Sequence, residues 1–136
     1  MKNSFALSLL FGAAVWGHAA FAETDEFAQG KYEFMSGCAA CHGENADGKG
    51  PIGAMFTRPI PDLTGIAKRN DGVFPVLKIF QIVDGRTAMK AHGNPMPVFG
   101  RRFQSEVGDK AGAFGGELQV RARVLELVFY LQSLQK

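Results

Sequence analysis

The residues with the clearest chemical meaning are Cys38-Ala39-Ala40-Cys41-His42, which contain both cysteines of the chain. Cys-x-x-Cys-His is the pattern of covalent c-type haem attachment, in which the thiols form thioethers with haem vinyl groups and the histidine ligates the iron. Two intervening residues let both thiols reach neighbouring substituents on one edge of the macrocycle, and His42 is then held beneath the metal. The motif therefore predicts one covalently bound haem c per chain, with Cys38 and Cys41 as the attachment sites and His42 as an axial ligand.

Other uses of two cysteines fit the sequence less well than haem attachment. A structural disulfide across a two-residue gap would close only a tiny loop and constrain little unfolded-state entropy. A thioredoxin-like redox pair normally belongs to a βαβ pattern, and no segment alternates well enough to predict a strand. A zinc site would need further ligands at the right spacing, whereas the chain after its signal segment offers only His42 and His92. Haem is the preferred interpretation, and a haem-free thiol-disulfide protein is an alternative.

A haem iron bound by His42 needs a second axial ligand from the opposite side. The candidates in the sequence are Met55, Met89, His92 and Met96. Met96 is preferred because Pro95 and Pro97 hold the backbone extended and keep this methionine out of a helix, whereas methionine elsewhere is ordinarily core filler. His92 in the same role would lower the reduction potential. An open or exchangeable site is the third possibility.

Three segments show the apolar periodicity of helices. The first begins with Thr24 as a cap and ends at Gly37, with Gly30 on the same face as Phe27, Lys31 and Phe34. The second extends from about Phe74 to Asp84, with Pro75 in its first turn, Gly85 at its end and a stripe formed by Val76, Ile79, Phe80 and Val83. The third is C-terminal and carries Val120, Val124, Leu127, Leu131 and Leu134, while Arg121, Arg123 and Glu126 point in other directions, as a surface helix requires.

Composition places these helices in a single globular domain. The chain has 136 residues, a formal net charge of +2 and 46% apolar residues. That balance excludes a disordered chain, a collagen-like chain and a strongly basic nucleic-acid binder. Glycine- and proline-rich loops are predicted over residues 43–65 and 85–100. A few short helices and two long loops make a small core for this length, which a large apolar cofactor at the centre would complete.

The first 22 residues have the pattern of a secretory signal peptide. A short basic start precedes the apolar stretch from Phe5 to Trp16, and Ala20-Phe21-Ala22 supplies a small-x-small cleavage pattern. Cleavage after Ala22 would leave residues 23–136 as the mature domain and, because Lys2 is lost, lower the net charge to +1. No later segment approaches membrane-spanning length. We therefore expect a protein exported to the bacterial periplasm, without a transmembrane segment in its mature form.

Over residues 24–135 the chain resembles the class I cytochromes c. Gly30, Phe34 and Cys38 are spaced as in that family's N-terminal helix, and Leu127-Val128-Phe129-Tyr130-Leu131 is similar to the aromatic end of its C-terminal helix. The resemblance implies an all-α cytochrome c fold in which these two helices cross, with the small Gly30 at the contact and long loops around one covalent haem.

Two loops also resemble the family's pattern. Pro61-Asp62-Leu63-Thr64-Gly65 is similar to its P-x-L-x-G loop, which implies that the Pro61 carbonyl accepts the proton on Nδ1 of His42; Gly50-Pro51 is the weaker candidate for that role. The Met96-Pro97 pair resembles the distal loop whose thioether binds iron.

Further residues are candidates for the surroundings of the haem. The expected apolar walls are Phe74, Ile79, Phe80, Val83, Phe99 and Leu127. Guanidinium geometry suits the two haem propionates, which makes Arg58, Arg101 and Arg102 candidates, although a solvated surface charge is the commoner role of any single arginine. Lysines that could steer a partner at an exposed haem edge are Lys68, Lys78, Lys90 and Lys110.

A haem with both axial positions filled has no vacant site for a substrate. The expected function is that of a periplasmic carrier of single electrons between a redox donor and an acceptor, not an enzyme, with no nucleic-acid partner. One alternative is a haem subunit of a larger dehydrogenase or oxidase, for which residues 101–116 could provide a contact because they depart from the most compact family pattern. Another is a gas sensor in which a small ligand displaces Met96.

Overall fold

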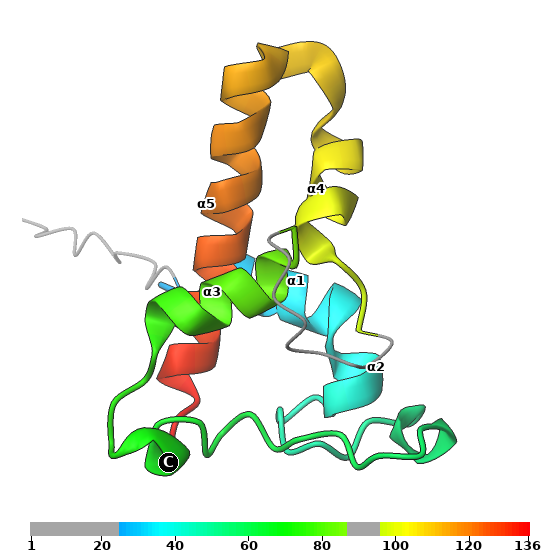
Figure 1. Cartoon of the computed structure of the whole chain (residues 1–136), viewed down its shortest axis with the longest axis vertical. Coiled ribbons are helices and arrows are strands. Elements are labelled where there is room, and N and C mark those ends of the chain that lie inside the picture. Colours follow the sequence, from blue (N-terminus) through cyan, green and yellow to red (C-terminus); the bar gives the residue numbers. More distant parts are fainter. Residues whose placement is uncertain (1–24, 87–95) are drawn as a thin grey trace, which may run out of the picture.

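The computed structural model describes residues 25–86 and 96–136, and within these ranges the secondary structure is entirely helical (Figure 1). The α-helices are α1 (Ala28–Gly37), α2 (Ala39–His42), α3 (Val76–Asp84), α4 (Phe99–Val107) and α5 (Gly112–Ser133). Three 3₁₀ turns are η1 (Gly53–Met55), η2 (Lys68–Asn70) and η3 (Gly108–Ala111). The all-α expectation is confirmed. No helix of the described ranges is long and apolar enough to cross a bilayer. The predicted signal peptide lies outside these ranges and stays a prediction.

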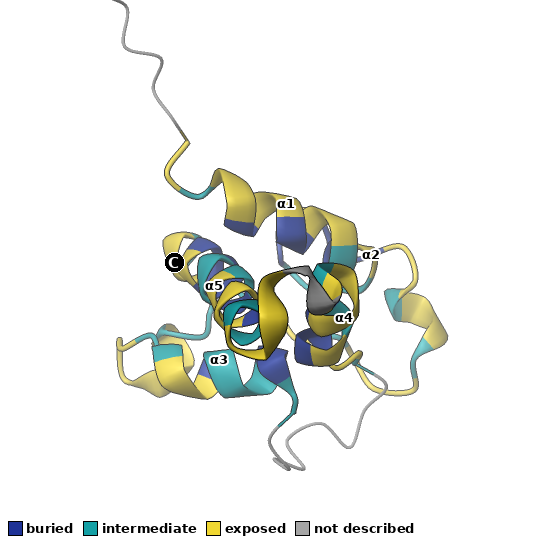
Figure 2. Ribbon diagram, turned by 90° about the horizontal axis from the view of Figure 1, so that it is seen from above, coloured by how far each residue is buried: buried dark blue, intermediate teal, exposed yellow. Residues whose placement is uncertain are grey.

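Helices α1 and α5 cross at Gly30, as the resemblance to class I cytochromes c implies. A Cβ atom at Gly30 would overlap the carbonyl of Glu126 and lie 2.7 Å from Cβ of Tyr130. Beside this contact the rings of Phe34 and Tyr130 are 5.6 Å apart between centroids. Figure 2 shows α1 and α3 on opposite sides of α5, with α4 beside it. Glycine therefore lets the two backbones approach closely, and α5 becomes the central helix of the domain.

The predicted boundaries of the first two helices are close to those observed. Helix α1 ends at Gly37 as expected and begins at Ala28, after a turn in which the Phe27 amide donates to the Asp25 carboxylate. Thr24, the expected cap, lies outside the described residues. Helix α3 ends at Asp84 as expected, and Gly85 directly after it has a φ of 64° that suits glycine. The helix begins two residues later than expected because Pro75 has a non-helical ψ of 73°.

Helix α4 was missed by the sequence analysis, which predicted loop up to residue 100 and no element over 101–116. Phe99 and Phe103 are buried and Val107 packs against the core, so apolar residues four apart form the inner face of this helix. Gly108 (φ 60°) and Gly112 (φ 67°) turn the chain into α5. The glycines interrupt helical structure over only one short turn, and residues 101–116, which depart from the compact family pattern, belong to a helical hairpin formed by α4 and the first half of α5.

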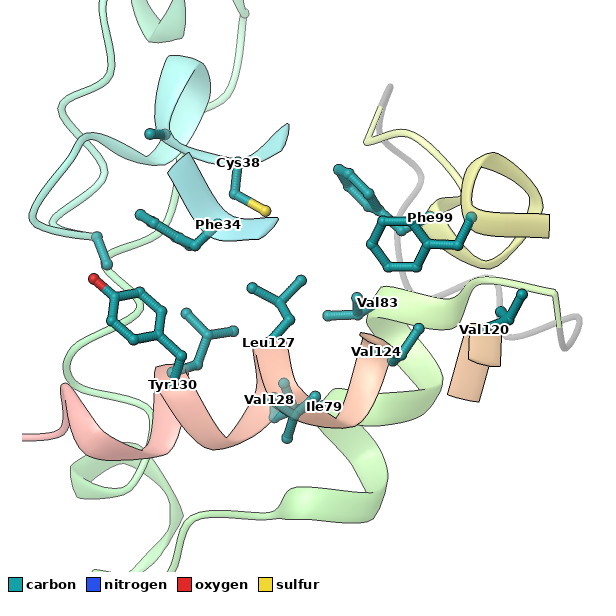
Figure 3. Packing of buried hydrophobic residues seen from close by; sticks show 14 residues of the cluster. Phe34, Cys38, Ile79, Val83, Phe99, Val120, Val124, Leu127, Val128 and Tyr130 are labelled. Carbon is teal, nitrogen blue, oxygen red and sulfur yellow. The ribbon is translucent and has the colours of Figure 1, made fainter. Parts of the chain in front are cut away.

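The core is centred on α5 (Figure 3). Its buried residues on that helix are Val120, Val124, Leu127, Val128, Tyr130 and Leu131, which meet Phe34 from α1, Ile79 and Val83 from α3, and Phe99 and Phe103 from α4. The apolar stripe predicted on the C-terminal helix is confirmed, except that Leu134 lies beyond the helix and is half-buried. The buried residues of α5 therefore contact three other helices, α1, α3 and α4.

A buried ion pair joins the helices on the side away from α3. The Glu33 carboxylate, only 1% exposed, accepts hydrogen bonds from Arg123 Nε at 2.7 Å and Nη2 at 3.0 Å. The Arg123 guanidinium lies over the Phe103 ring, 4.0 Å from its centroid, and also pairs with Glu106 at 2.7 Å. Arg123 lies off the apolar stripe as expected, but it faces a neighbouring helix, where its charge compensates a carboxylate buried between α1 and α5.

Candidate haem-binding site

The predicted site residues come together around one cavity of about 270 Å³. It is bounded by α1, α2, α3, α5, the loop after α2 and the segment that begins at Met96. The lining includes all five residues singled out from the sequence, which are Cys38, Cys41, His42, Pro61 and Met96. Because these residues come from segments far apart in the sequence, the fold itself brings the proposed attachment sites and axial ligands to one apolar space.

A single helical turn positions the motif. Cys38 ends α1 and begins α2, its amide donates to the Phe34 carbonyl at 2.8 Å, and its own carbonyl accepts from the His42 amide at 2.9 Å. Figure 3 shows the Cys38 sulfur pointing toward the side on which Leu127 and Phe99 lie. Cys38 is buried, while Cys41 and His42 are half-buried. The change of direction between α1 and α2 thus turns both thiols and the imidazole toward the cavity.

The loop after α2 fastens this turn through backbone hydrogen bonds. The Gly50 amide donates to the Cys41 carbonyl at 3.1 Å, and the Gly48 amide donates to the His42 carbonyl at 2.8 Å. These bonds satisfy carbonyls at the helix end that have no partner within the helix. A Cβ atom at Gly50 would overlap the Cys41 backbone, so glycine is required for the approach. Gly50, the weaker candidate for orienting His42, instead supports the backbone of the motif.

Pro61 lies where the resemblance placed it. Its carbonyl oxygen is 3.3 Å from Nδ1 of His42. When Nδ1 carries the proton and donates to this oxygen, Nε2 is the basic nitrogen, as metal ligation requires. The adjacent turn is fixed by Thr64, whose amide and hydroxyl both donate to the Asp62 carboxylate at 2.7 Å and lower the pKa of that carboxyl. Arg69 adds a hydrogen bond to the Asp62 carbonyl at 2.6 Å.

The end of the chain closes the Pro61 loop from the other side. The Gln135 side chain donates to the Leu63 carbonyl at 2.9 Å and accepts from the Ala67 amide at 2.9 Å. The Lys136 amide donates to the Thr64 carbonyl at 3.0 Å. The loop that contacts His42 is therefore held by residues that follow α5, an arrangement that no local sequence pattern indicates.

Met96 is half-buried and lines the same cavity, together with its neighbour Pro97 and with the buried Phe99. Met55, on η1, is 82% exposed and does not line it. Two other candidates, Met89 and His92, lie outside the described residues. Among the described candidates, Met96 is the one that presents a thioether to the cavity; its ligation of iron stays a prediction.

The apolar walls were predicted in part. Ile79, Val83, Phe99 and Leu127 line the cavity, whereas Phe74 and Phe80 do not and pack against the core elsewhere. On α3, Ile82 takes the place expected for Phe80 because the helix presents the 79, 82 and 83 positions to the cavity. The lining residues that the sequence analysis missed are Phe34, Gly37, Phe56, Ile60, Leu63, Ile66, Arg69, Ile82, Pro97 and Leu131. Isolated apolar residues in the glycine- and proline-rich loop, such as Ile60, are the sequence feature that could have indicated this part of the lining.

Of the arginines and lysines predicted to lie near the haem, only some line the cavity. Arg58 lines the cavity together with Arg69, which the sequence analysis did not select. Arg101 and Arg102 are not among the lining residues, and Arg102 instead pairs with Glu106 at 2.8 Å on α4. Lys68 and Lys78 are exposed, while Lys90 and the side chain of Lys110 lie outside the description. Arg101 is exposed and Arg102 lies in an ion pair on α4, so the alternative of a surface charge fits these two candidates better.

The state of the thiols argues against a thiol-disulfide enzyme. Both cysteines are free, and burial raises the pKa of the Cys38 thiol to about 12, more than the nearby Arg102 charge lowers it. Reactive redox cysteines have the opposite property, a lowered pKa that yields thiolate at neutral pH. Within residues 25–86 and 96–136 no group of three or more His, Cys, Asp and Glu side chains is placed to hold a metal ion. Two thiols, an imidazole and a thioether around an apolar cavity fit a covalently bound haem.

Comparison with known families agrees with this geometry. A family model described as Cytochrome c matches residues 27–110, more than half of the chain, and the chain belongs to that family. Membership implies covalent haem c and haem-based electron transfer, and the family's members are typically carriers rather than catalysts. The match covers α1 to α4, and α5 lies beyond it. Searches among curated proteins and among solved structures returned no match.

Proposed function

We propose that the protein is a periplasmic monohaem cytochrome c that passes single electrons between two redox partners through a haem ligated by His42 and Met96. The observation that carries the proposal is the cavity lined jointly by Cys38, Cys41, His42 and Met96, with the His42 ring nitrogen 3.3 Å from the Pro61 carbonyl. A bound haem supplies the one-electron chemistry. With both axial positions filled by side chains, the site offers no open position for a substrate.

The surrounding residues have distinct tasks. Cys38 and Cys41 hold the cofactor covalently, and Pro61 fixes the orientation and tautomer of His42. Phe99, Leu127 and the other apolar walls exclude water, which raises the potential by disfavouring the additional positive charge of the oxidised iron. Little rearrangement of this packed lining is needed when one electron is gained or lost.

Arg58 and Arg69 are proposed to bind the haem propionates. Both line the cavity, and a guanidinium can donate two parallel hydrogen bonds to a carboxylate. Arg69 already donates to the Asp62 carbonyl, so its side chain is held beside the Pro61 loop. In this arrangement the propionates would lie on the side of the cavity formed by the loop between α2 and α3.

Periplasmic location is supported by the signal-peptide pattern of residues 1–22.

A second candidate function, that of a haem subunit within a larger redox complex, is favoured by one observation. Phe114 and Leu118 lie one turn apart on the first half of α5 and are 79% and 53% exposed. These two side chains would be covered if this part of α5 contacted another protein. Co-purification with a larger redox protein would favour the subunit, whereas a lone monomer would favour the shuttle.

The visible and near-infrared spectra of the mature protein, made with the c-type haem maturation machinery, test the proposal. A sharp low-spin spectrum on reduction, with the weak charge-transfer band of methionine ligation on oxidation, is expected. A low-spin spectrum without that band would assign the ligand to His92, and a high-spin spectrum that changes with carbon monoxide would favour the gas sensor. Protein without covalent haem would contradict the assignment altogether.

A further inference from the structure

The chain that leaves α3 is in direct contact with the chain that enters α4, on the two sides of residues 87–95. A Cβ atom at Gly85 would lie 3.2 Å from Cγ1 of Val98. A Cβ atom at Gly100 would lie 2.6 Å from Nε of Arg86 and would overlap the Asp84 carboxylate. These contacts leave no room for a side chain at Gly100. They place the start of α4, three residues beyond Met96, against the end of α3.

Arg86 is the centre of this contact. Its Nε donates to Asp84 Oδ1 at 2.8 Å, and its Nη1 and Nη2 donate to the two carboxylate oxygens of Glu117 at 2.6 and 3.0 Å. The Arg86 and Asp84 side chains are 21% and 8% exposed. Arg86 therefore links the end of α3 to α5, next to the first turn of α4. We call the three residues Asp84, Arg86 and Glu117 the clasp.

The clasp is difficult to open because Asp84, its most buried member, has Arg86 as its ion-pair partner. Glu117 is paired with Arg121 as well. Asp84 is almost buried, and removing its arginine would leave an uncompensated carboxylate against the first turn of α4. The bidentate arrangement on Glu117 also fixes the direction of the guanidinium. Since Gly100 rests on this pair and Phe99 lines the cavity, movement of the clasp is transmitted to the backbone that carries Met96.

We propose that Arg86 is a positioning residue for Met96, which acts by holding the start of α4 against the end of α3 so that the thioether stays at the haem iron. The inference rests on the proposed His42 and Met96 ligation. Weakening the clasp increases the fraction of molecules in which Met96 is displaced. An added ligand competes for the position that Met96 leaves, so its apparent affinity increases in proportion to that fraction.

The test uses haem-loaded protein and three variants: Arg86→Gln, Glu117→Gln and Arg121→Gln. Arg121 is the matched control because its Nε also pairs with Glu117, at 2.8 Å, but from the exposed side of α5 and without contact to the clasp's other members. Imidazole is titrated into the oxidised protein while the methionine charge-transfer band is followed. We expect Arg86→Gln to bind imidazole roughly tenfold more tightly than the unmodified protein, and Glu117→Gln to show a smaller shift in the same direction.

Two additional variants separate positioning from loss of folding. Arg86→Lys retains one charge and should recover part of the lost resistance to imidazole. The double variant Arg86→Gln, Glu117→Gln should shift the affinity by less than the product of the single shifts, because both changes open the same contact. If Arg86→Gln does not mature, Glu117→Gln still provides the test, since it leaves Arg86 paired with Asp84.

The outcomes distinguish this inference from the function on which it rests. A charge-transfer band in the unmodified protein, with unchanged imidazole affinity in Arg86→Gln and Glu117→Gln, would overturn the positioning role alone. Equal shifts in all three single variants, Arg121→Gln included, would also overturn it by indicating general loosening of α5. Absence of the band in the unmodified protein would overturn the Met96 ligation and the positioning role together.

Discussion

Arg123 and Glu33 form a bidentate ion pair between α5 and α1, with Nε and Nη2 of the arginine 2.7 and 3.0 Å from the two oxygens of a carboxylate that is 1% exposed. The same guanidinium covers the Phe103 ring and pairs with Glu106 on α4. The Arg123 guanidinium therefore compensates the buried Glu33 carboxylate and at the same time connects α5 to α1 and to α4.

Replacing Arg123 with methionine should consequently destabilise the protein. Glu33 would be left buried without its partner, a change that costs about 3 to 5 kcal/mol in comparable sites. Urea unfolding of the haem-loaded protein measures the difference in the free energy of unfolding. The control is Arg121→Gln, an exposed pair with Glu117 whose loss should cost less than about 1 kcal/mol. Equal losses in the two variants would contradict the role given to the buried pair.

Gly30→Ala should destabilise the crossing of α1 and α5. The added Cβ overlaps the Glu126 carbonyl, so the helices must separate, and overpacking of this kind costs about 1 to 3 kcal/mol. Thermal unfolding measures the loss. Gly116→Ala is the matched control, because this helical glycine has no atom closer than 3.7 Å to the added Cβ and alanine is the better helix former. A stable Gly30→Ala with an unchanged melting temperature would show that the helices do not meet at this residue.

Stability should decrease in acid partly through Glu117. Hydrogen bonds from Arg86 and then Arg121 lower the pKa of its carboxyl to about 2 from the ordinary value of 4.5. Because the folded pKa lies below the unfolded one, the contribution of this group is complete above about pH 4.5 and is lost as the pH falls toward 2. Urea unfolding across this range should give a shallower pH dependence for Glu117→Gln than for the unmodified protein. Parallel profiles would contradict the assignment.

Met96→Ala should retain covalent haem, since Cys38 and Cys41 are unchanged, but lose the low-spin spectrum and the methionine charge-transfer band. Its reduction potential should fall, because a thioether ligand raises the potential. Optical spectra and redox titration measure both changes. Met55→Ala is the control, as this methionine is 82% exposed and does not line the cavity. Unchanged spectra in Met96→Ala would assign ligation to another residue, first among them His92.

The sequence was most informative where function or close packing demands one residue type at a fixed spacing. The order Gly30, Phe34, Cys38 carries the resemblance that implies the helix crossing, and in the structure only glycine fits against Glu126. The apolar stripe of α3 predicts the face that includes Ile79 and Val83. Such signals are local, since each depends on residues within one or two helical turns.

Features that depend on distant partners could not be predicted in this way. By their local patterns alone, Glu33 and Arg123 are charged residues on the polar sides of two separate helices. Only the crossing of α1 and α5 brings them together. Arg69 reaches the cavity because its loop folds back on the Pro61 turn, which local periodicity does not indicate. Helix α4 was missed because glycines at 108 and 112 interrupt the pattern that Phe99 and Phe103 begin.

The crossing at Gly30 also has a consequence for biosynthesis. Gly30 and Tyr130 lie far apart in the sequence, so their contact forms only when both helices of the crossing are present and folded together. Cys38 follows Gly30 by two helical turns and is buried in the folded domain. Before the crossing forms, its thiol is accessible to a haem attachment enzyme without any opening of the core. Attachment that precedes this contact therefore needs no unfolding step.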